Sequence, residues 1–117
     1  MLRGAMVLVV AAIAFGGVAC SSNGGEAVCE DPVPTTDVTM TDFAYAPECV
    51  EASPGDTLTL VNSGETPHTF TVTVVDIEAD VAAGATGELQ LDGVTAGTTY
   101  QVICNYHPQM TAALKIV

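Results

Sequence analysis

The chain has 117 residues, and 14 acidic residues against two basic ones give it a formal net charge of −12 at pH 7. This length suits a single domain. The charge excludes a nucleic-acid partner, because phosphate binding requires a basic surface. The acidic residues are scattered along the chain, so they either steer basic partners toward the protein or serve solubility alone.

The first 19 residues have the pattern of an export signal. Arg3 precedes an apolar run over residues 6–15, which is shorter than the roughly 20 residues that span a bilayer and is typical of a signal peptide. Small residues at 16–19 precede Cys20, as in the lipobox of bacterial lipoproteins, although Gly17 stands where that motif usually has Leu. We therefore expect a signal peptide over residues 1–19 and a lipidated Cys20. An ordinary secretory signal that is cleaved nearby is the alternative.

Residues 20–36 are expected to form a tether between the lipid anchor and the folded domain. The tether begins with a Ser- and Gly-rich stretch over residues 21–25, a composition typical of flexible linkers. Lipidation would hold the protein at the cell membrane, where it faces the periplasm or the cell exterior. An exported protein meets an oxidising compartment, so a disulfide is the simple use of Cys29 and Cys49. It would close a loop of about 20 residues and stabilise the fold by roughly 3 kcal/mol. Metal coordination by one of these cysteines is the competing interpretation, but neither has a His or Cys at ligand spacing.

From residue 37 onward, short alternating runs separated by Gly, Pro and Asp predict an antiparallel β-sandwich. The alternation is clearest over residues 57–61 and 69–74, and residues 88–92 form a further expected strand. Residues 76–85 are expected to form a loop or an irregular strand. No helical period of useful length occurs after the signal segment.

Three of these segments are expected to bring polar or sulfur-containing side chains to one end of the interior. His68 has the same parity as Phe70 in its strand, and Cys104 has the same parity as Val102. Side chains of equal parity share one face of a strand. Met110 stands at the start of the last expected strand.

Residues 104–110 contain a Cys-x2-His-x2-Met pattern, formed by Cys104, His107 and Met110. The only other histidine of the chain is His68. Two His and one Cys in a plane with a weak axial Met are the ligands of a mononuclear blue-copper centre. Each residue alone would more often be an ordinary part of a core, but the combination predicts one copper ion.

Residues 37–117 resemble a small cupredoxin of the plastocyanin and amicyanin kind. The short ligand loop is most similar to that of amicyanin. The resemblance implies a cupredoxin-like, antiparallel Greek-key β-sandwich and a type 1 copper site with the four ligands named above. The matching segments are residues 38–47, 54–62, 100–104 and 110–117.

Four further residues are expected to support the ligands. Pro108 stiffens the ligand loop, and Asn62 either hydrogen-bonds across the ligand loops or serves plain turn chemistry. Thr69 stands where many cupredoxins carry an Asn that ties the two ligand loops together. Tyr106 stands where amicyanin-like loops have Pro, so it has a backbone N–H that can reach the thiolate and favour Cu(I). The alternative is that only the Tyr106 side chain acts, in partner docking.

The sequence offers no base or nucleophile constellation, and four protein ligands leave no open position for a substrate. We therefore expect an electron carrier and not an enzyme, shuttling one electron through Cu(I)/Cu(II) in the bacterial cell envelope. The resemblance implies that electrons pass through the outer edge of His107, within an apolar patch near Pro108 and Met110. Its expected partners are redox proteins such as a cytochrome or an oxidoreductase, and we expect a monomer.

Two other functions stay open. A membrane-anchored copper storage or delivery protein is the main alternative, but Met40 is the only methionine besides Met110 after the signal segment, and such proteins would be expected to have more. A structural module with a vestigial site is the other.

Overall fold

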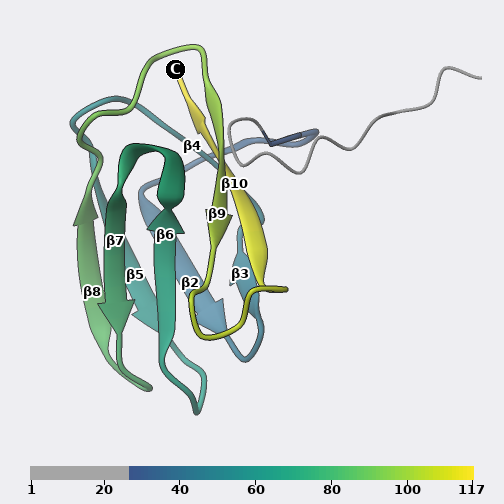
Figure 1. Ribbon diagram of the computed structural model, residues 1–117, viewed down its shortest axis with the longest axis vertical. Helices are drawn as coiled ribbons and strands as arrows, with labels where there is room; N and C mark the ends of the chain where they lie inside the picture. Colours follow the sequence, from purple (N-terminus) through teal and green to yellow (C-terminus); the bar gives the residue numbers. More distant parts are fainter. Residues whose placement is uncertain (1–26) are drawn as a thin grey trace, which may run out of the picture.

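The computed structural model describes residues 27–117. The expected signal peptide, the expected lipidation site at Cys20 and the first residues of the expected tether lie outside this range. Ten strands form two sheets that pack face to face (Figure 1). No helix in residues 27–117 is long and apolar enough to cross a membrane. The strands are β1 (Val33–Pro34), β2 (Asp37–Thr41), β3 (Ala44–Ala46), β4 (Cys49–Ala52), β5 (Thr57–Asn62), β6 (His68–Val72), β7 (Ile77–Val81), β8 (Thr86–Gln90), β9 (Thr99–Ile103) and β10 (Thr111–Ile116).

The larger sheet has the strand order β1-β4-β10-β9-β6-β7, and the smaller one has the order β3-β2-β5-β8. The expected β-sandwich is confirmed, but its sheets are mixed and not purely antiparallel. The pairs β1–β4, β4–β10 and β2–β5 are parallel, and the other pairs are antiparallel. The chain crosses from one sheet to the other after β1, β3, β4, β5, β7 and β8, and these crossings allow parallel neighbours.

The core lies between the two sheets and follows the alternation of the strands. In β5, Leu58 and Leu60 are fully buried while the residues beside them are more exposed. Strand β6 differs, because all five of its residues are buried. Its inward side chains include Phe70 and Val72, and burying each contributes roughly 1.5–3 kcal/mol. The large buried side chains of the core also include those of Met40, Tyr45, Leu91, Met110, Leu114 and Ile116.

Two segments differ from the expectation. The strand expected over residues 69–74 ends at Val72, where a 3-10 turn, η1 (Thr73–Val75), begins. Asp76 then adopts a left-handed backbone conformation that turns the chain back. The expectation of a loop or irregular strand over residues 76–85 was wrong for its first half, because β7 pairs regularly with β6 over five residues. Strand β7 lies at the edge of its sheet, and its sequence alternates apolar Ile77, Ala79 and Val81 with acidic Glu78 and Asp80, which is the period of a half-buried strand.

The described part of the expected tether lies along the larger sheet. Cys29 and Cys49 form the expected disulfide, with a Cα–Cα distance of 5.7 Å. Strand β1 pairs with β4, and the N–H of Ala27 donates to the carbonyl of Thr99 at 3.1 Å. The disulfide therefore pins the chain to β4 before the first strand of the smaller sheet begins. The domain boundary expected at residue 37 stays a prediction.

Candidate metal centre

The four predicted copper ligands lie at one end of the sandwich, the end opposite the C-terminus (Figure 1). His68 opens β6, Cys104 directly follows β9, and Met110 directly precedes β10. Strands β9 and β10 pair so that Ile103 faces Thr111, which closes the loop between them. Three backbone hydrogen bonds hold this loop: Cys104 N–H to the Met110 carbonyl at 3.1 Å, His107 N–H to the Cys104 carbonyl at 3.2 Å, and Met110 N–H to the His107 carbonyl at 2.8 Å.

The side chains of His68 and Cys104 stand at the spacing of two ligands of one metal ion. His68 Nδ1 lies 3.9 Å from Cys104 Sγ, and both residues are fully buried. Metal–nitrogen and metal–sulfur bonds of about 2.0 and 2.3 Å, as in zinc sites, place two such donors roughly 3.7 Å apart in a trigonal plane. Cys104 is the free cysteine among residues 27–117. The donor set therefore fits a thiophilic metal ion.

His107 and Met110 lie on the loop between β9 and β10. The rings of His107 and His68 have their centroids 5.2 Å apart, and Met110 is buried. Within residues 27–117, no three His, Cys, Asp or Glu side chains are arranged to hold a metal ion by themselves. His107 Nε2 lies 3.4 Å from the hydroxyl of Thr66, and Met110 would add a thioether. The structure thus places His68 and Cys104 at ligand spacing and the His107 ring beside that of His68. The role of the four residues as copper ligands stays a prediction.

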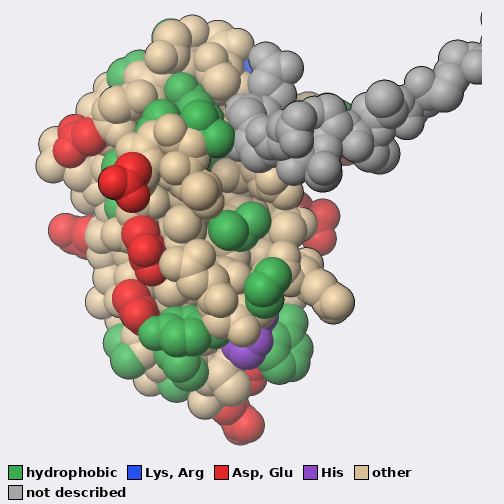
Figure 2. Space-filling view, viewed as in Figure 1, with side chains coloured by type: hydrophobic (Ala, Val, Ile, Leu, Met, Phe, Trp, Pro, Cys, Tyr) green, Lys and Arg blue, Asp and Glu red, His purple; other side chains and the backbone are tan. Residues whose placement is uncertain are grey.

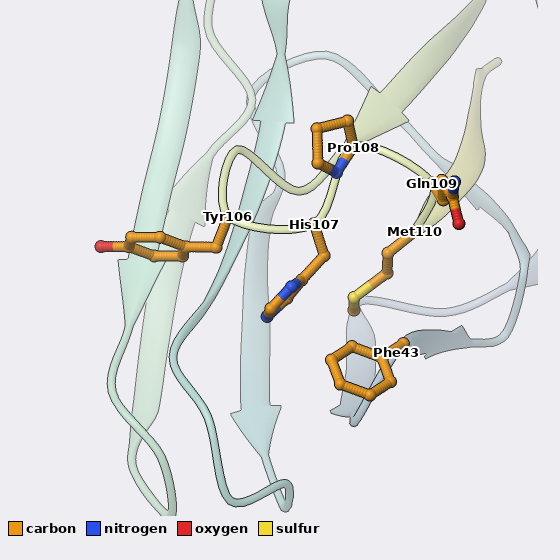
Figure 3. Close-up of a pocket in the computed structure, with 6 residues that line it drawn as sticks. All are labelled: Phe43, Tyr106, His107, Pro108, Gln109 and Met110. Carbon is orange, nitrogen blue, oxygen red and sulfur yellow. The ribbon is translucent and has the colours of Figure 1, made fainter.

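A pocket of about 550 Å³ opens beside His107. In Figure 3, the His107 ring and the Met110 side chain lie on the Phe43 side of the loop, and the Tyr106 side chain extends away from them. The pocket is the place where the ligand loop meets solvent. Its lining residues are Phe43, Tyr106, His107, Pro108, Gln109 and Met110.

The sequence matches the family description "Cupredoxin-like domain" over residues 6–117. The chain belongs to the cupredoxin-like family. A purple cupredoxin from Nitrosopumilus maritimus is similar in structure, with 17% identity and a TM-score of 0.56, and the match covers 69% of this chain and 98% of that one. Amicyanin from Paracoccus versutus (Thiobacillus versutus) has 18% identity and a TM-score of 0.58, and the match covers 83% of this chain and 94% of that one. A comparison with curated proteins finds no match. At these identities, the likeness to solved structures establishes the shared fold alone.

In this cupredoxin, Thr69 links the two ligand loops. Its N–H donates to Cys104 Sγ at 3.3 Å, and its hydroxyl oxygen accepts the N–H of Asn105 at 2.9 Å. The same hydroxyl lies 2.9 Å from that of Thr71. The Thr69 carbonyl accepts the hydroxyl of Tyr45, and burial raises the pKa of Tyr45, so that this phenol stays a neutral donor. The link that many family members make with Asn is therefore made here with Thr.

The second N–H···S hydrogen bond expected from Tyr106 is not formed within residues 27–117. Thr69 gives the Cys104 sulfur its backbone hydrogen bond, and Tyr106 acts through its side chain. The Tyr106 hydroxyl donates to Asp80, and this hydrogen bond is the main cause of a raised pKa of Tyr106. The neighbouring Asn105 amide donates to Glu78 at 2.8 Å. Both contacts fasten the ligand loop to β7.

Asn62 stabilises its own loop and does not bond to the loop of residues 104–110. Its side-chain amide donates to the carbonyls of Thr66 and Val81, both at 2.9 Å, and its Oδ1 accepts the N–H of Gly64 at 3.0 Å. Of the two interpretations of this residue, turn chemistry is the one that the contacts support. The bond to Val81 also ties the loop before His68 to the end of β7.

Sequence reasoning missed three residues that contact the histidines: Asp42, Phe43 and Thr66, whose hydroxyl lies 3.4 Å from Nε2 of both rings. Asp42 Oδ1 accepts a hydrogen bond from His68 Nε2 at 2.9 Å. Hydrogen bonds to this carboxylate, the strongest from the N–H of Glu65, lower the pKa of Asp42 to about 2. Phe43 packs edge-on against His107, with ring centroids 4.8 Å apart. Asp42 and Phe43 lie in the turn between β2 and β3, and only the pairing of β2 with β5 brings this turn beside His68.

Proposed function

We propose that this cupredoxin binds one copper ion as a type 1 site and carries single electrons. His68, Cys104, His107 and Met110 would hold the ion. When bound, copper would supply a one-electron Cu(I)/Cu(II) couple, for which a thiolate, two imidazoles and a thioether are suited. The observation that carries the proposal is the buried, free thiol of Cys104, 3.9 Å from His68 Nδ1. Family membership supports it.

The protein's part in this function is to keep the donor atoms in fixed positions and to exclude water from them. The three backbone hydrogen bonds of the loop over residues 104–110 restrict its movement, and Thr69 fastens the loop to β6. A site whose donors move little when the charge of the ion changes transfers electrons with a small reorganisation energy. Burial of Cys104 and His68 keeps water away. Because four protein donors leave no position for a substrate, we propose a carrier and not an enzyme.

Electrons would enter and leave through His107, at the pocket lined by Phe43, Pro108 and Met110. Figure 2 shows histidine framed by hydrophobic side chains at one end of the molecule, with Asp and Glu side chains along the same face. This arrangement supports docking of a redox protein, such as a cytochrome or an oxidoreductase, that carries basic groups around an apolar contact. We propose that the protein acts as a monomer.

The place of action is proposed from the sequence. The apolar run over residues 6–15 and the small residues before Cys20 support export and lipidation. The carrier would then work at the cell membrane, facing the periplasm or the cell exterior. The disulfide between Cys29 and Cys49 is consistent with an oxidising compartment.

Storage or delivery of copper is the alternative function. Met40, the methionine besides Met110 in residues 27–117, is completely buried in the core, so it adds no second thioether site at the surface. Voltammetry of the copper-loaded protein separates the two functions. A carrier cycles reversibly between two oxidation states and keeps its copper in the presence of a moderate chelator. Irreversible waves and ready loss of copper to the chelator would favour storage.

A further inference from the structure

The carboxylate of Asp42 forms the centre of a hydrogen-bond network beside both histidines. Its Oδ2 accepts the N–H of Glu65 at 2.9 Å, and its Oδ1 accepts the N–H of Thr66 at 3.3 Å and the hydroxyl of Thr66 at 2.9 Å. The same Oδ1 lies 2.9 Å from His68 Nε2. The turn between β2 and β3 is thus bonded directly to the loop that leads into β6.

This contact decides which nitrogen of His68 carries the proton. A carboxylate can only accept a hydrogen bond, and a neutral imidazole has one N–H. The bond to Asp42 therefore requires the proton of His68 on Nε2. Its Nδ1 is left with a free lone pair on the side of Cys104 Sγ, which is the state that a metal ligand requires.

Thr66 extends the same effect to His107. The Thr66 hydroxyl donates its single proton to Asp42 Oδ1, so its oxygen remains an acceptor. His107 Nε2 lies 3.4 Å from this oxygen, a long contact that also favours a proton on Nε2 and a free Nδ1. One carboxylate thus sets the orientation of two rings, strongly at His68 and more weakly at His107.

The backbone around Asp42 is shaped to admit this carboxylate. A Cβ atom on Gly64 would lie against Asp42 Oδ1 and 2.9 Å from Asp42 Cγ, so any larger residue there would displace the carboxylate. Phe43, the next residue in the chain, has a φ of 135°, which is unusual for a bulky side chain. Strained backbone of this kind persists where the surrounding structure holds it, often at functional sites.

We propose that Asp42 is a positioning residue that fixes His68, and through Thr66 also His107, with Nε2 protonated and Nδ1 turned to the metal. The inference rests on the proposed copper function. Metal-binding histidines commonly donate their other N–H to a carboxylate, which orients the ring and raises its basicity, and loss of such a partner costs about 10–100-fold in metal affinity. A more basic imidazole favours Cu(II) over Cu(I).

The first test uses the metal-free wild-type protein labelled with 15N. At a pH where the rings are neutral, the nitrogen chemical shifts should show His68 protonated at Nε2 and not at Nδ1. A proton on Nδ1 of His68 would overturn the proposal, whether or not the protein binds copper. Wild-type protein that binds no copper would instead refute the proposed function, so the two failures are distinguishable.

The second test compares Cu(II) and Cu(I) affinities by chelator competition and voltammetry. Asp42→Ala should lower the Cu(II) affinity about 10–100-fold and the Cu(I) affinity less, so the reduction potential rises. Gly64→Ala, which keeps Asp42 but displaces its carboxylate, should act in the same direction. Asp42→Asn keeps an oxygen acceptor without the charge and should show a smaller change; it also serves if Asp42→Ala does not fold. The control is Asp92→Ala, because the exposed Asp92 carboxylate makes no hydrogen bond within residues 27–117.

Pulsed EPR of the Cu(II) protein distinguishes the effect of Asp42 on His68 from the effect of Thr66 on His107. The Thr66 hydroxyl lies 3.4 Å from Nε2 of both rings, but His68 keeps its shorter bond of 2.9 Å to Asp42. Thr66→Val should therefore change the signal of the remote nitrogen of His107 more than that of His68, whereas Asp42→Ala should change both. Unchanged Cu(II) affinity in both Asp42 variants would overturn the proposal. Equal losses of Cu(I) and Cu(II) affinity, with the wild-type potential, would also overturn it, because the carboxylate would then only hold the loops together.

Discussion

Replacing Thr69 by Val removes one hydroxyl from the link between the ligand loops and changes little else. The backbone N–H of residue 69 that reaches Cys104 Sγ stays in place. The N–H of Asn105 loses its acceptor, and the hydroxyl of Thr71 loses its partner. Val has nearly the shape of Thr, so no cavity opens beside the core.

The structure gives the size of the effect. Each hydrogen bond contributes about 0.5–1.5 kcal/mol net, so the two bonds lost in Thr69→Val should lower the free energy of unfolding by about 1–3 kcal/mol. Thr71→Val loses only the bond between the two hydroxyls and should cost about 0.5–1.5 kcal/mol. The difference between the two variants measures the bond from Asn105. In a domain of this size, each kcal/mol lowers the Tm by about 4–8 °C.

Urea unfolding of the metal-free proteins, with the disulfide intact, measures these free energies. The Thr71→Val variant is the matched control, because it makes the same chemical change two residues further along β6 and leaves the Asn105 bond in place. If Thr69→Val is as stable as Thr71→Val, the hydroxyl of Thr69 does not link the loops, and the reasoning is refuted.

Three further predictions concern the surface, the anchor and the metal preference. Asp80→Asn should lower the pKa of Tyr106 toward its ordinary value of about 10, which phenolate absorbance measures with Tyr106→Phe as the blank. Because folding raises the pKa of Tyr106, the bond to Asp80 stabilises the fold below a pH of about 10. This stabilisation is lost as the pH rises through the raised pKa. Full-length protein should partition into detergent and carry an acyl-glyceryl group on Cys20, whereas Cys20→Ala should be released or stay unprocessed; an intact mass without lipid would contradict this. Zn(II) should bind the same site more weakly than Cu(II), as the Irving–Williams order requires, and an equal affinity in competition titrations would speak against the copper assignment.

The sequence alone predicted the features that depend on local patterns. Alternation placed Leu58 and Leu60 on the inner face of β5 and His68 toward the interior, as found. The Cys-x2-His-x2-Met residues lie within one loop between two strands. Because they are close in sequence, a short turn brings them near one another independently of the pairing of distant strands.

Features that depend on pairing between distant strands could not be predicted in this way. Strand β7 alternates apolar side chains with exposed Glu78 and Asp80, so its strand period is present in the sequence, whereas its pairing with β6 is not. Asp42 lies 26 residues before His68, and nothing in its neighbourhood marks it as a partner. Its role depends on the parallel pairing of β2 with β5, which local spacing does not show.

The most direct test of the copper assignment is the absorption spectrum of the purified protein with one equivalent of Cu(II). Charge transfer from the Cys104 thiolate should turn the wild-type solution intensely blue or green, and Cys104→Ser should stay colourless. A colourless wild-type protein, or a coloured Cys104→Ser variant, would contradict the proposed site.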